Sequence, residues 1–352
     1  MPDFLVRRDD LRTTDVREAD EAPLSGGEAR LRIERFGFTA NNVTYGAFGE
    51  QMGYWRFFPA PEGWGRIPVW GFGEVVESQA PGVEPGQRFF GYLPMSSTVT
   101  MQPKAGPGGF EDASPHRAEL PSTYNRYFEA TPEAGFPPEH DAATAVMRPL
   151  FMTGWLIAQH LKNSTGTVAL ASASSKTAYS TAYALGQLED APAIIALTSS
   201  RNADFVRSLG FYDTVLTYDE ADELPRGESL RYVDMAGDPQ LRRAVHEHLG
   251  DDLSASIVVG ATHWDQASLG GDPLPGPAPE FFFAPTVAEQ LATELGPAEF
   301  QRRIGADWRG FLEPLGQVLE IDAESGPEAI DRVYRSFLDG SADPRKGHVL
   351  NL

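Results

Sequence analysis

A loop of small hydroxyl residues with one lysine is the first feature of this sequence that could bind a charged ligand. The loop lies at residues 171–178, after an apolar segment and before a helical pattern. Hydroxyl groups can donate hydrogen bonds to a diphosphate, the lysine adds positive charge, and the threonine is expected to cap the following helix. Dinucleotides are held in this way, with the pyrophosphate at a helix N-terminus after the first strand of a parallel sheet. The residues expected to bind the phosphates are Ser172, Ser174, Ser175, Lys176 and Thr177.

The loop contains no glycine, although dinucleotide loops normally use glycines so that backbone N–H groups approach the pyrophosphate. An alternative interpretation is therefore that the loop has lost its nucleotide and that its serines only cap a helix. A mononucleotide loop is a third interpretation suggested by Lys176-Thr177, but Ser175 occupies the place of the glycine that should precede the lysine.

A second phosphate-binding pattern follows the next apolar segment, at residues 193–198. An acidic residue at the end of this strand would accept the ribose hydroxyls of NAD, whereas Ser199, Ser200 and Arg201 suit the 2′-phosphate of NADP. The sequence therefore favours NADP(H) as cofactor. The alternative is an arginine that simply starts a solvated helix.

Composition excludes several classes of protein. The chain has 352 residues and no cysteine, so it forms no disulfide and uses neither a thiolate nucleophile nor a cysteine-ligated metal. Its 29 basic and 50 acidic residues give a formal charge of −21, which disfavours nucleic-acid partners. No apolar run is long enough to span a membrane. The N-terminal residues lack the pattern of a secretory signal, so we expect a cytoplasmic protein.

The order of predicted elements indicates an α/β protein with two domains. Strands are expected at 29–38, 69–78 and 87–92, and one face of the first should carry Leu31, Ile33 and Arg35. Residues 103–138 are rich in Pro, Gly, Ser and Glu and are expected to form a lid or binding loop. Later strands are expected at 167–171, 193–198, 214–218, 232–235, 256–260, 316–321 and 347–352, and helices at 142–161 with a break at Pro149, 177–188, 203–209, 241–249, 286–295, 298–312 and 328–339.

Three segments resemble the medium-chain dehydrogenase/reductase superfamily, in its zinc-free branch similar to quinone oxidoreductases. They are residues 67–91, with glycines around a predicted strand and a Gly-Gln-Arg turn, residues 167–178, and residues 194–213. The resemblance covers nearly the whole chain, and residues 103–138 are the main departure. In detail the chain is similar to an uncharacterised family of unknown function, on the strings at residues 39–42, 173–177 and 281–285.

This resemblance implies a GroES-like β-rich catalytic domain, residues 1–140 and 285–352, and a doubly wound parallel Rossmann sheet in residues 141–284. It also implies a homodimer paired through the last strand of the nucleotide sheet, near residues 256–261. Zinc-dependent members use Cys, His and acidic ligands near the first catalytic strand. Because there is no cysteine and no histidine before residue 116, we expect no metal. Further cofactor contacts are implied at Gly237, Gly260, Thr262 and Phe283.

The resemblance places the reaction near residues 39–45. Asn42 would orient the nicotinamide, and Tyr45 would hydrogen-bond the substrate oxygen or return a proton, since free tyrosine has a pKa of ~10 and is a donor at neutral pH. Tyr54 is a second donor candidate. Alternatives are a turn for Asn42, a half-buried strand end for Tyr45 and simple aromatic packing for Tyr54. Candidate substrate contacts are Tyr124, Tyr127 and Arg148, although the arginine could equally pair with a surface acid.

Without a metal, hydride would have to reach a carbon that is already electrophilic by conjugation, as in an enone, quinone or enoyl group. The function expected is therefore the NADPH-dependent reduction of a small conjugated carbonyl compound. Two alternatives remain: a non-catalytic nucleotide-binding or sensor protein on the same scaffold, and a reductase of saturated ketones.

Overall fold

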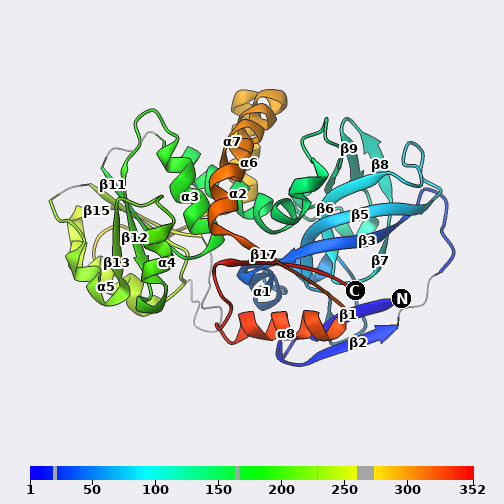
Figure 1. Ribbon diagram of the computed structural model, residues 1–352, viewed down its shortest axis with the longest axis horizontal. Helices are drawn as coiled ribbons and strands as arrows, with labels where there is room; N and C mark the ends of the chain where they lie inside the picture. The colour runs from blue at the N-terminus through cyan, green and yellow to red at the C-terminus, as the bar shows by residue number, and fades with distance from the viewer. Residues whose placement is uncertain (19–21, 163–165, 228, 260–272) are drawn as a thin grey trace. The chain divides into compact units, whose positions relative to one another are not determined.

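The structure is a computed structural model that describes residues 1–18, 22–162, 166–227, 229–259 and 273–352. The chain forms two compact units (Figure 1). Unit 1 comprises Met1–Pro149 and Glu320–Leu352, and unit 2 comprises Leu150–Leu319. The second unit is thus inserted between two parts of the first. Its borders lie later in the chain than residues 141 and 284, the ones expected from sequence.

Unit 1 is built on a mixed sheet in the order β17-β18-β3-β5-β6-β10-β9-β8, with β7 paired to β3. All pairings are antiparallel except that of β17 with β18. The bounds are β3 Ala29–Phe38, β5 Pro68–Ser78, β6 Arg88–Pro94, β7 Thr98–Met101, β8 Pro103–Gly106, β9 Gly109–Asp112, β10 Arg126–Glu129, β17 Glu320–Ser325 and β18 Lys346–Asn351. A smaller sheet joins β1 Pro2–Arg7, β2 Thr14–Glu18 and β4 Trp64–Gly65, and the helices are α1 Ala40–Ala47 and α8 Pro327–Leu338.

Strand β3 has the predicted bounds, but the predicted face of Arg35 is wrong. Ile33 pairs with Gly73 and Arg35 with Phe72, so Glu34 is an extra residue on this strand. Such a β-bulge shifts the alternation of side chains by one position. Arg35 is therefore exposed, and Phe36 takes its place in the core.

The segment at 103–138, expected to be a lid or binding loop, contains β8, β9 and β10, which extend the sheet of unit 1. Its role toward a ligand stays a prediction. A buried ion pair anchors the segment: Arg117 Nε lies 3.0 Å from Asp112 Oδ2, and both side chains are 1% exposed. Asp112 also accepts hydrogen bonds from the backbone N–H groups of Gln102 and Ser114. Because a buried charge without a partner is costly, this pair requires one arrangement of the segment.

Unit 2 contains a parallel sheet in the order β13-β12-β11-β14-β15-β16. Strands β11 and β12 are mostly apolar and buried, as expected for strands covered on both faces. The strands are β11 Thr167–Ala171, β12 Ala193–Thr198, β13 Thr214–Thr217, β14 Leu230–Asp234, β15 Leu253–Val258 and β16 Glu280–Phe281. The helices are α2 Asp141–Leu161, which begins in unit 1, α3 Lys176–Gly186, α4 Ala203–Ser208, α5 Pro239–Leu249, α6 Ala284–Leu295 and α7 Pro297–Val318. The predicted α/β class, with a β-rich sheet and a parallel sheet, is confirmed.

Three local predictions are corrected. Helix α2 continues through Pro149, whose ring leaves the carbonyl of Ala145 without its helical donor. Strand β3 approaches that carbonyl closely because residue 37 is glycine: a Cβ there would lie 2.4 Å from the Ala145 oxygen. Residues 316–318 end α7 instead of starting a strand. Strand β15, which is expected from the sequence to be the last strand of the sheet, has β16 as a neighbour at Ile257 and Val258.

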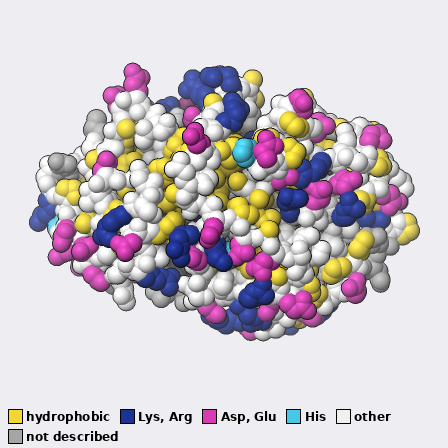
Figure 2. Space-filling model, in the orientation of Figure 1, with side chains coloured by type: hydrophobic (Ala, Val, Ile, Leu, Met, Phe, Trp, Pro, Cys, Tyr) yellow, Lys and Arg dark blue, Asp and Glu magenta, His cyan; other side chains and the backbone are white. Residues whose placement is uncertain are grey.

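Two expectations concern the molecular surface. Among the described residues, no helix is both long and apolar enough to cross a membrane. On the face shown in Figure 2, acidic and basic side chains occur in small interspersed groups.

Candidate functional site

The loop between β11 and α3 retains the strand–turn–helix geometry of a phosphate-binding loop. Ser172 adopts φ +53°, the only positive φ at a non-glycine residue in the described part of the chain. A glycine would adopt this conformation without strain. Here Ser172 adopts the backbone conformation that a glycine would have in such a loop. The N-cap is Ser175, whose Oγ accepts from the N–H of Ala178. The expectation that Thr177 caps the helix is therefore wrong, because Thr177 already lies inside the first turn.

Neighbouring segments hold the loop in shape. The N–H of Ala173 donates to Leu197 O at 3.1 Å, and Asn202 Nδ2 donates to Ser174 Oγ at 3.0 Å. Ser172, Ser174 and Lys176 are buried, whereas Ser175 and Thr177 are half-buried. Serine hydroxyls that accept these bonds keep their own hydrogens for donation, and the first N–H groups of a helix have no partner within it. The residues present therefore fit a diphosphate.

The second phosphate-binding pattern lies at the end of β12. Ser199 is half-buried, and Ser200 and Arg201 are exposed, in a short 3₁₀ turn at Ser200–Asn202. At the end of β12, Thr198 Oγ1 is fully buried and, within the described ranges, makes no hydrogen bond. The three predicted residues thus lie together, directly after the strand that neighbours β11.

The turn after β14 is stabilised by a buried carboxylate. Asp234 Oδ1 accepts from the N–H groups of Ala236 and Gly237 at 3.0 and 2.9 Å, and Asp234 Oδ2 accepts from Arg242 Nε at 2.8 Å. Burial raises the pKa of Asp234, and the Arg242 guanidinium opposes that shift. Gly237 has φ +70°, so it serves this turn whatever it contacts. Its predicted role toward the cofactor stays a prediction.

The remaining predicted cofactor contacts follow β15. Gly260 and Thr262 lie outside the described residues. Phe283 is the N-cap residue of α6, is half-buried and stacks against Phe281 with 6.5 Å between ring centres. Its role toward a cofactor also stays a prediction.

In unit 1, residues 39–45 begin helix α1 instead of forming a turn or a strand end. Asn42 and Thr39 form a capping box, in which Asn42 Oδ1 accepts from Thr39 N at 2.8 Å. Asn42 Nδ2 donates to the carbonyl of Pro68 at 2.9 Å, and the side chain is 3% exposed. The structure therefore gives Asn42 a structural part, and its predicted contact with the nicotinamide stays a prediction.

Tyr45 and Tyr54 pack together in an aromatic cluster, which we call the tyrosine cluster. Their ring centres are 4.6 Å apart, and Tyr124 lies 6.4 and 6.0 Å from them. The structure thus brings together three residues predicted from separate parts of the sequence. The other members are Phe57, Phe58, Tyr92 and Leu120, with Met52, Trp70 and Val99 packed against them.

The cluster keeps its hydroxyls protonated. Burial raises the pKa of each of Tyr45, Tyr92 and Tyr124 above that of free tyrosine, and repulsion between neighbouring phenolates raises it further. Burial also raises the pKa of Tyr54. Buried phenols of this kind are hydrogen-bond donors at neutral pH. The predicted donor role is therefore compatible with the surroundings.

The other two predicted substrate residues lie elsewhere in unit 1. Tyr127 is fully buried, and its hydroxyl accepts from Arg117 Nη1 at 3.1 Å and donates to the carbonyl of Tyr92. Burial raises the pKa of Tyr127 to about 12. The Arg148 guanidinium lies 4.3 Å from the centre of the Phe136 ring. Neither residue belongs to the tyrosine cluster, and their roles toward a substrate stay predictions.

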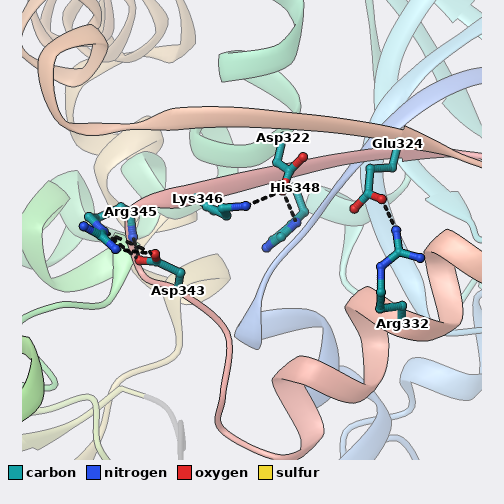
Figure 3. Close-up of polar contacts among 7 residues, drawn as sticks. All are labelled: Asp322, Glu324, Arg332, Asp343, Arg345, Lys346 and His348. Atoms are coloured by element: carbon teal, nitrogen blue, oxygen red, sulfur yellow. Dashed lines mark hydrogen bonds and ion pairs between the residues drawn. The ribbon is translucent and has the colours of Figure 1, made fainter.

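Within the described ranges, one group of side chains has the composition of a metal site: Asp322, Glu324 and His348, on β17 and β18. Figure 3 shows that both carboxylates face cations: Asp322 Oδ2 accepts from Lys346 Nζ at 2.9 Å, and Glu324 pairs with Arg332. The bond from Lys346 lowers the pKa of Asp322. A metal ion would have to displace both cations, so the group is better described as an ion-pair network.

Sequence reasoning missed Trp70 and Tyr92 as members of the tyrosine cluster. They are directly opposite each other in the antiparallel pair β5–β6, with ring centres 5.2 Å apart. Alignment of the two predicted strands as a hairpin would have paired them, because opposite residues share a face. The buried ion pair of Asp112 and Arg117 could not be predicted from the sequence, because the two side chains come together only through the turn at η2 Pro115–Arg117.

Solved structures share this fold over the full chain. CurA from Vibrio vulnificus, in complex with NADPH, is 13% identical with a TM-score of 0.69, and the match covers 100% of this chain and 99% of CurA. The yhdH oxidoreductase from Salmonella enterica, in complex with NADP, is 13% identical with a TM-score of 0.56 and complete coverage of both chains. The CurK enoyl reductase is 13% identical with a TM-score of 0.55, over 99% of each chain.

No curated protein sequence matches this chain. The structural matches are distant in sequence and establish the fold of the medium-chain dehydrogenases and reductases. Residues 36–343 match the family described as "Protein of unknown function (DUF2855)". The chain therefore belongs to the DUF2855 family, on a medium-chain dehydrogenase/reductase fold.

Proposed function

We propose that this protein is an NADPH-dependent reductase of a small conjugated carbonyl compound and that it uses no metal. The observation that carries the proposal is the glycine-free loop at 172–175, which keeps a left-handed residue, a serine N-cap and a helix N-terminus in the order of a phosphate-binding loop. The nicotinamide would supply the hydride. The structural matches to proteins solved with NADPH or NADP support this choice of cofactor.

The side chains after β12 favour NADPH over NADH. Arg201 and Ser200 are exposed directly after the strand, next to Ser199, and no acidic residue stands among them. A guanidinium and hydroxyl donors match a doubly charged phosphate, whereas ribose hydroxyls would need a carboxylate acceptor. Lys176, in the first turn of α3, would add charge toward the pyrophosphate.

In unit 1, the tyrosine cluster would stabilise the product of hydride transfer. Hydride addition to the β-carbon of a conjugated carbonyl group moves negative charge to its oxygen, where a donor lowers the barrier. Burial raises the pKa of Tyr45 and of Tyr54, which keeps their hydroxyls protonated and able to donate to such an oxygen. In this proposal Tyr45 holds that oxygen, and a proton later reaches the enolate from the cluster or from water.

The cofactor assignment is tested by titration of NADPH and NADH, monitored by quenching of tryptophan fluorescence. We expect Arg201→Ala to weaken NADPH binding by about 10- to 100-fold, the loss of a charged hydrogen bond, and to change NADH binding little. Arg207→Ala is the matched control, because Arg207 is also exposed but pairs with Asp204 on α4. Equal loss for both nucleotides would remove the NADPH assignment, and binding of neither by the wild type would favour a sensor protein.

The reaction class is tested by NADPH consumption with enones, quinones and saturated ketones. We expect turnover with the conjugated compounds only, since no Lewis acid is needed for a carbon that is already electrophilic. Turnover of saturated ketones alone would replace this assignment by a different oxidoreduction.

A further inference from the structure

The tyrosine cluster contains more hydrogen-bond donors than its own contacts use. Tyr92 is fully buried, and its hydroxyl makes no hydrogen bond to any described residue. The indole N–H of Trp70 is also buried; it lies near the Tyr45 hydroxyl but makes no hydrogen bond of good geometry with any residue that the structure describes. A buried donor without an acceptor is unfavourable, because it has lost its hydrogen bonds to water and has gained none in the protein. Two such donors in one cluster require an explanation.

The unpaired donors lie beside the other phenols. The Tyr92 ring centre is 4.8 Å from that of Tyr124 and 5.6 Å from that of Tyr45, and Trp70 lies 5.2 Å from Tyr92. Hydrogen bonds of Tyr124 with Tyr45 and Tyr54 affect the pKa of these tyrosines, so these three hydroxyl groups are close together. The Tyr92 hydroxyl and the Trp70 indole thus belong to the same shell of aromatic rings as these three phenols.

We propose that these groups form an oxyanion-binding site for a planar, unsaturated ligand, with Tyr92 and Trp70 as donors in addition to Tyr45, Tyr54 and Tyr124. The ligand class is an enolate or phenolate, which deepens the reduction proposed above and rests on it. An indole N–H is a donor only, so the missing partner is an acceptor and not a cation or an N–H group. The surrounding rings favour a flat, conjugated body next to that oxygen.

The segment that carries Tyr124 also places a cation under this site. Arg117 stacks on Phe57 and Phe58, with its guanidinium carbon 5.5 and 4.6 Å from their ring centres. Its positive charge favours the ionised form of Tyr92. The same field would favour an anionic ligand oxygen near that hydroxyl, while the ion pair with Asp112 keeps the guanidinium in place.

Direct binding of para-nitrophenol to the full-length protein tests the site without turnover. Its phenolate absorbs visible light and its phenol form does not, so the spectrum reports which form is bound. We expect the wild type to bind the phenolate at least tenfold more tightly than para-nitroanisole, which has the same flat ring but no ionisable oxygen. Equal binding of both compounds, or binding of neither, would overturn the proposal.

Two substitutions separate binding from packing. Tyr124→Phe and Tyr92→Phe should each lower phenolate affinity about tenfold. Tyr334→Phe is the matched control, because this tyrosine is also buried in unit 1 but donates to Leu11 O outside the cluster. Its affinity should stay within about twofold of the wild type. Tyr92→Phe should also raise the melting temperature, since it removes an unsatisfied hydroxyl.

The outcomes distinguish this site from the proposed function. Phenolate binding that depends on Tyr92 and Tyr124, without NADPH consumption by any enone or quinone, would retain the oxyanion site and remove the reductase assignment. If the wild type reduces enones but Tyr92→Phe and Tyr124→Phe bind phenolate as the wild type does, the reductase assignment would be retained and the oxyanion site removed. A lower melting temperature of Tyr92→Phe at unchanged affinity would show that this hydroxyl serves packing, contrary to the proposal.

Discussion

At the scale of single residues, the loop between β11 and α3 has serines where a dinucleotide-binding loop normally has glycines. Ser172 takes the left-handed conformation that a glycine would adopt, and its hydroxyl contacts Tyr218. A non-glycine residue in this conformation costs roughly 1–2 kcal/mol. Strain of this kind persists where the surroundings impose it, and it is typical of functional sites.

We expect the stability of variants at Ser172 to depend on how easily the new residue adopts a positive φ. Ser172→Val should lower the free energy of unfolding by roughly 2 kcal/mol, because a β-branched residue is a genuine outlier at positive φ. Ser172→Gly should change it by less than about 1 kcal/mol, since relief of strain offsets the entropy of glycine in the unfolded chain. Thermal unfolding followed by circular dichroism measures both. A valine variant as stable as the glycine variant would contradict the assigned conformation.

At the scale of secondary structure elements, α1 shows how one residue joins two elements. Asn42 caps the helix from within its first turn and donates to the carbonyl of Pro68 at the start of β5. It thereby fixes the direction of the helix that carries Tyr45. Sequence reasoning placed the asparagine and the tyrosine correctly in one segment but gave that segment the wrong secondary structure.

Asn42→Ala should therefore act on stability before it acts on catalysis. The substitution leaves the N–H of Thr39 and the carbonyl of Pro68 without partners, which should cost about 2–4 kcal/mol in unfolding free energy. Asn41→Ala is the control, because this half-buried side chain hydrogen-bonds Tyr45 but caps nothing, so its loss should affect the tyrosine cluster and leave the start of the helix intact. Urea denaturation measures the difference. An Asn42→Ala protein of normal stability with much weaker NADPH binding would instead support the nicotinamide contact.

At the scale of the whole molecule, the net charge of −21 acts on stability. Like charges repel across a folded surface, and salt screens them over distances of about 10 Å at 0.1 M ionic strength. Most ion pairs here have at least one exposed partner, as between Arg12 and Asp339, and such pairs contribute little. Self-repulsion should therefore be the larger of the two effects.

We expect the melting temperature to rise when sodium chloride is increased from low ionic strength to about 0.5 M. The chloride salt is chosen because sulfate stabilises most proteins by its exclusion from their surfaces. Differential scanning calorimetry at neutral pH measures the trend. A fall in melting temperature would mean that the ion pairs outweigh the repulsion.

The sequence by itself determined the class of the fold and the strands of the parallel sheet. Strands β11 and β12 match their predicted bounds because runs of buried apolar residues between turn signals have few alternatives. The turn between strand and helix that is predicted to bind phosphate was also recognisable, since strand, loop and helix follow one another along the chain. Local patterns of this kind need no knowledge of distant contacts.

Only the tertiary structure decided which side chains meet. The tyrosine cluster joins α1, β5, β6 and the segment at 103–138, so no spacing in the sequence reveals it. The bulge at Glu34, the passage of α2 through Pro149 and the strands β8 to β10 likewise depend on what packs against them. Contacts between residues far apart in sequence overrode local preference in each case, because burial and pairing of polar groups outweigh propensities of less than about 1 kcal/mol per residue.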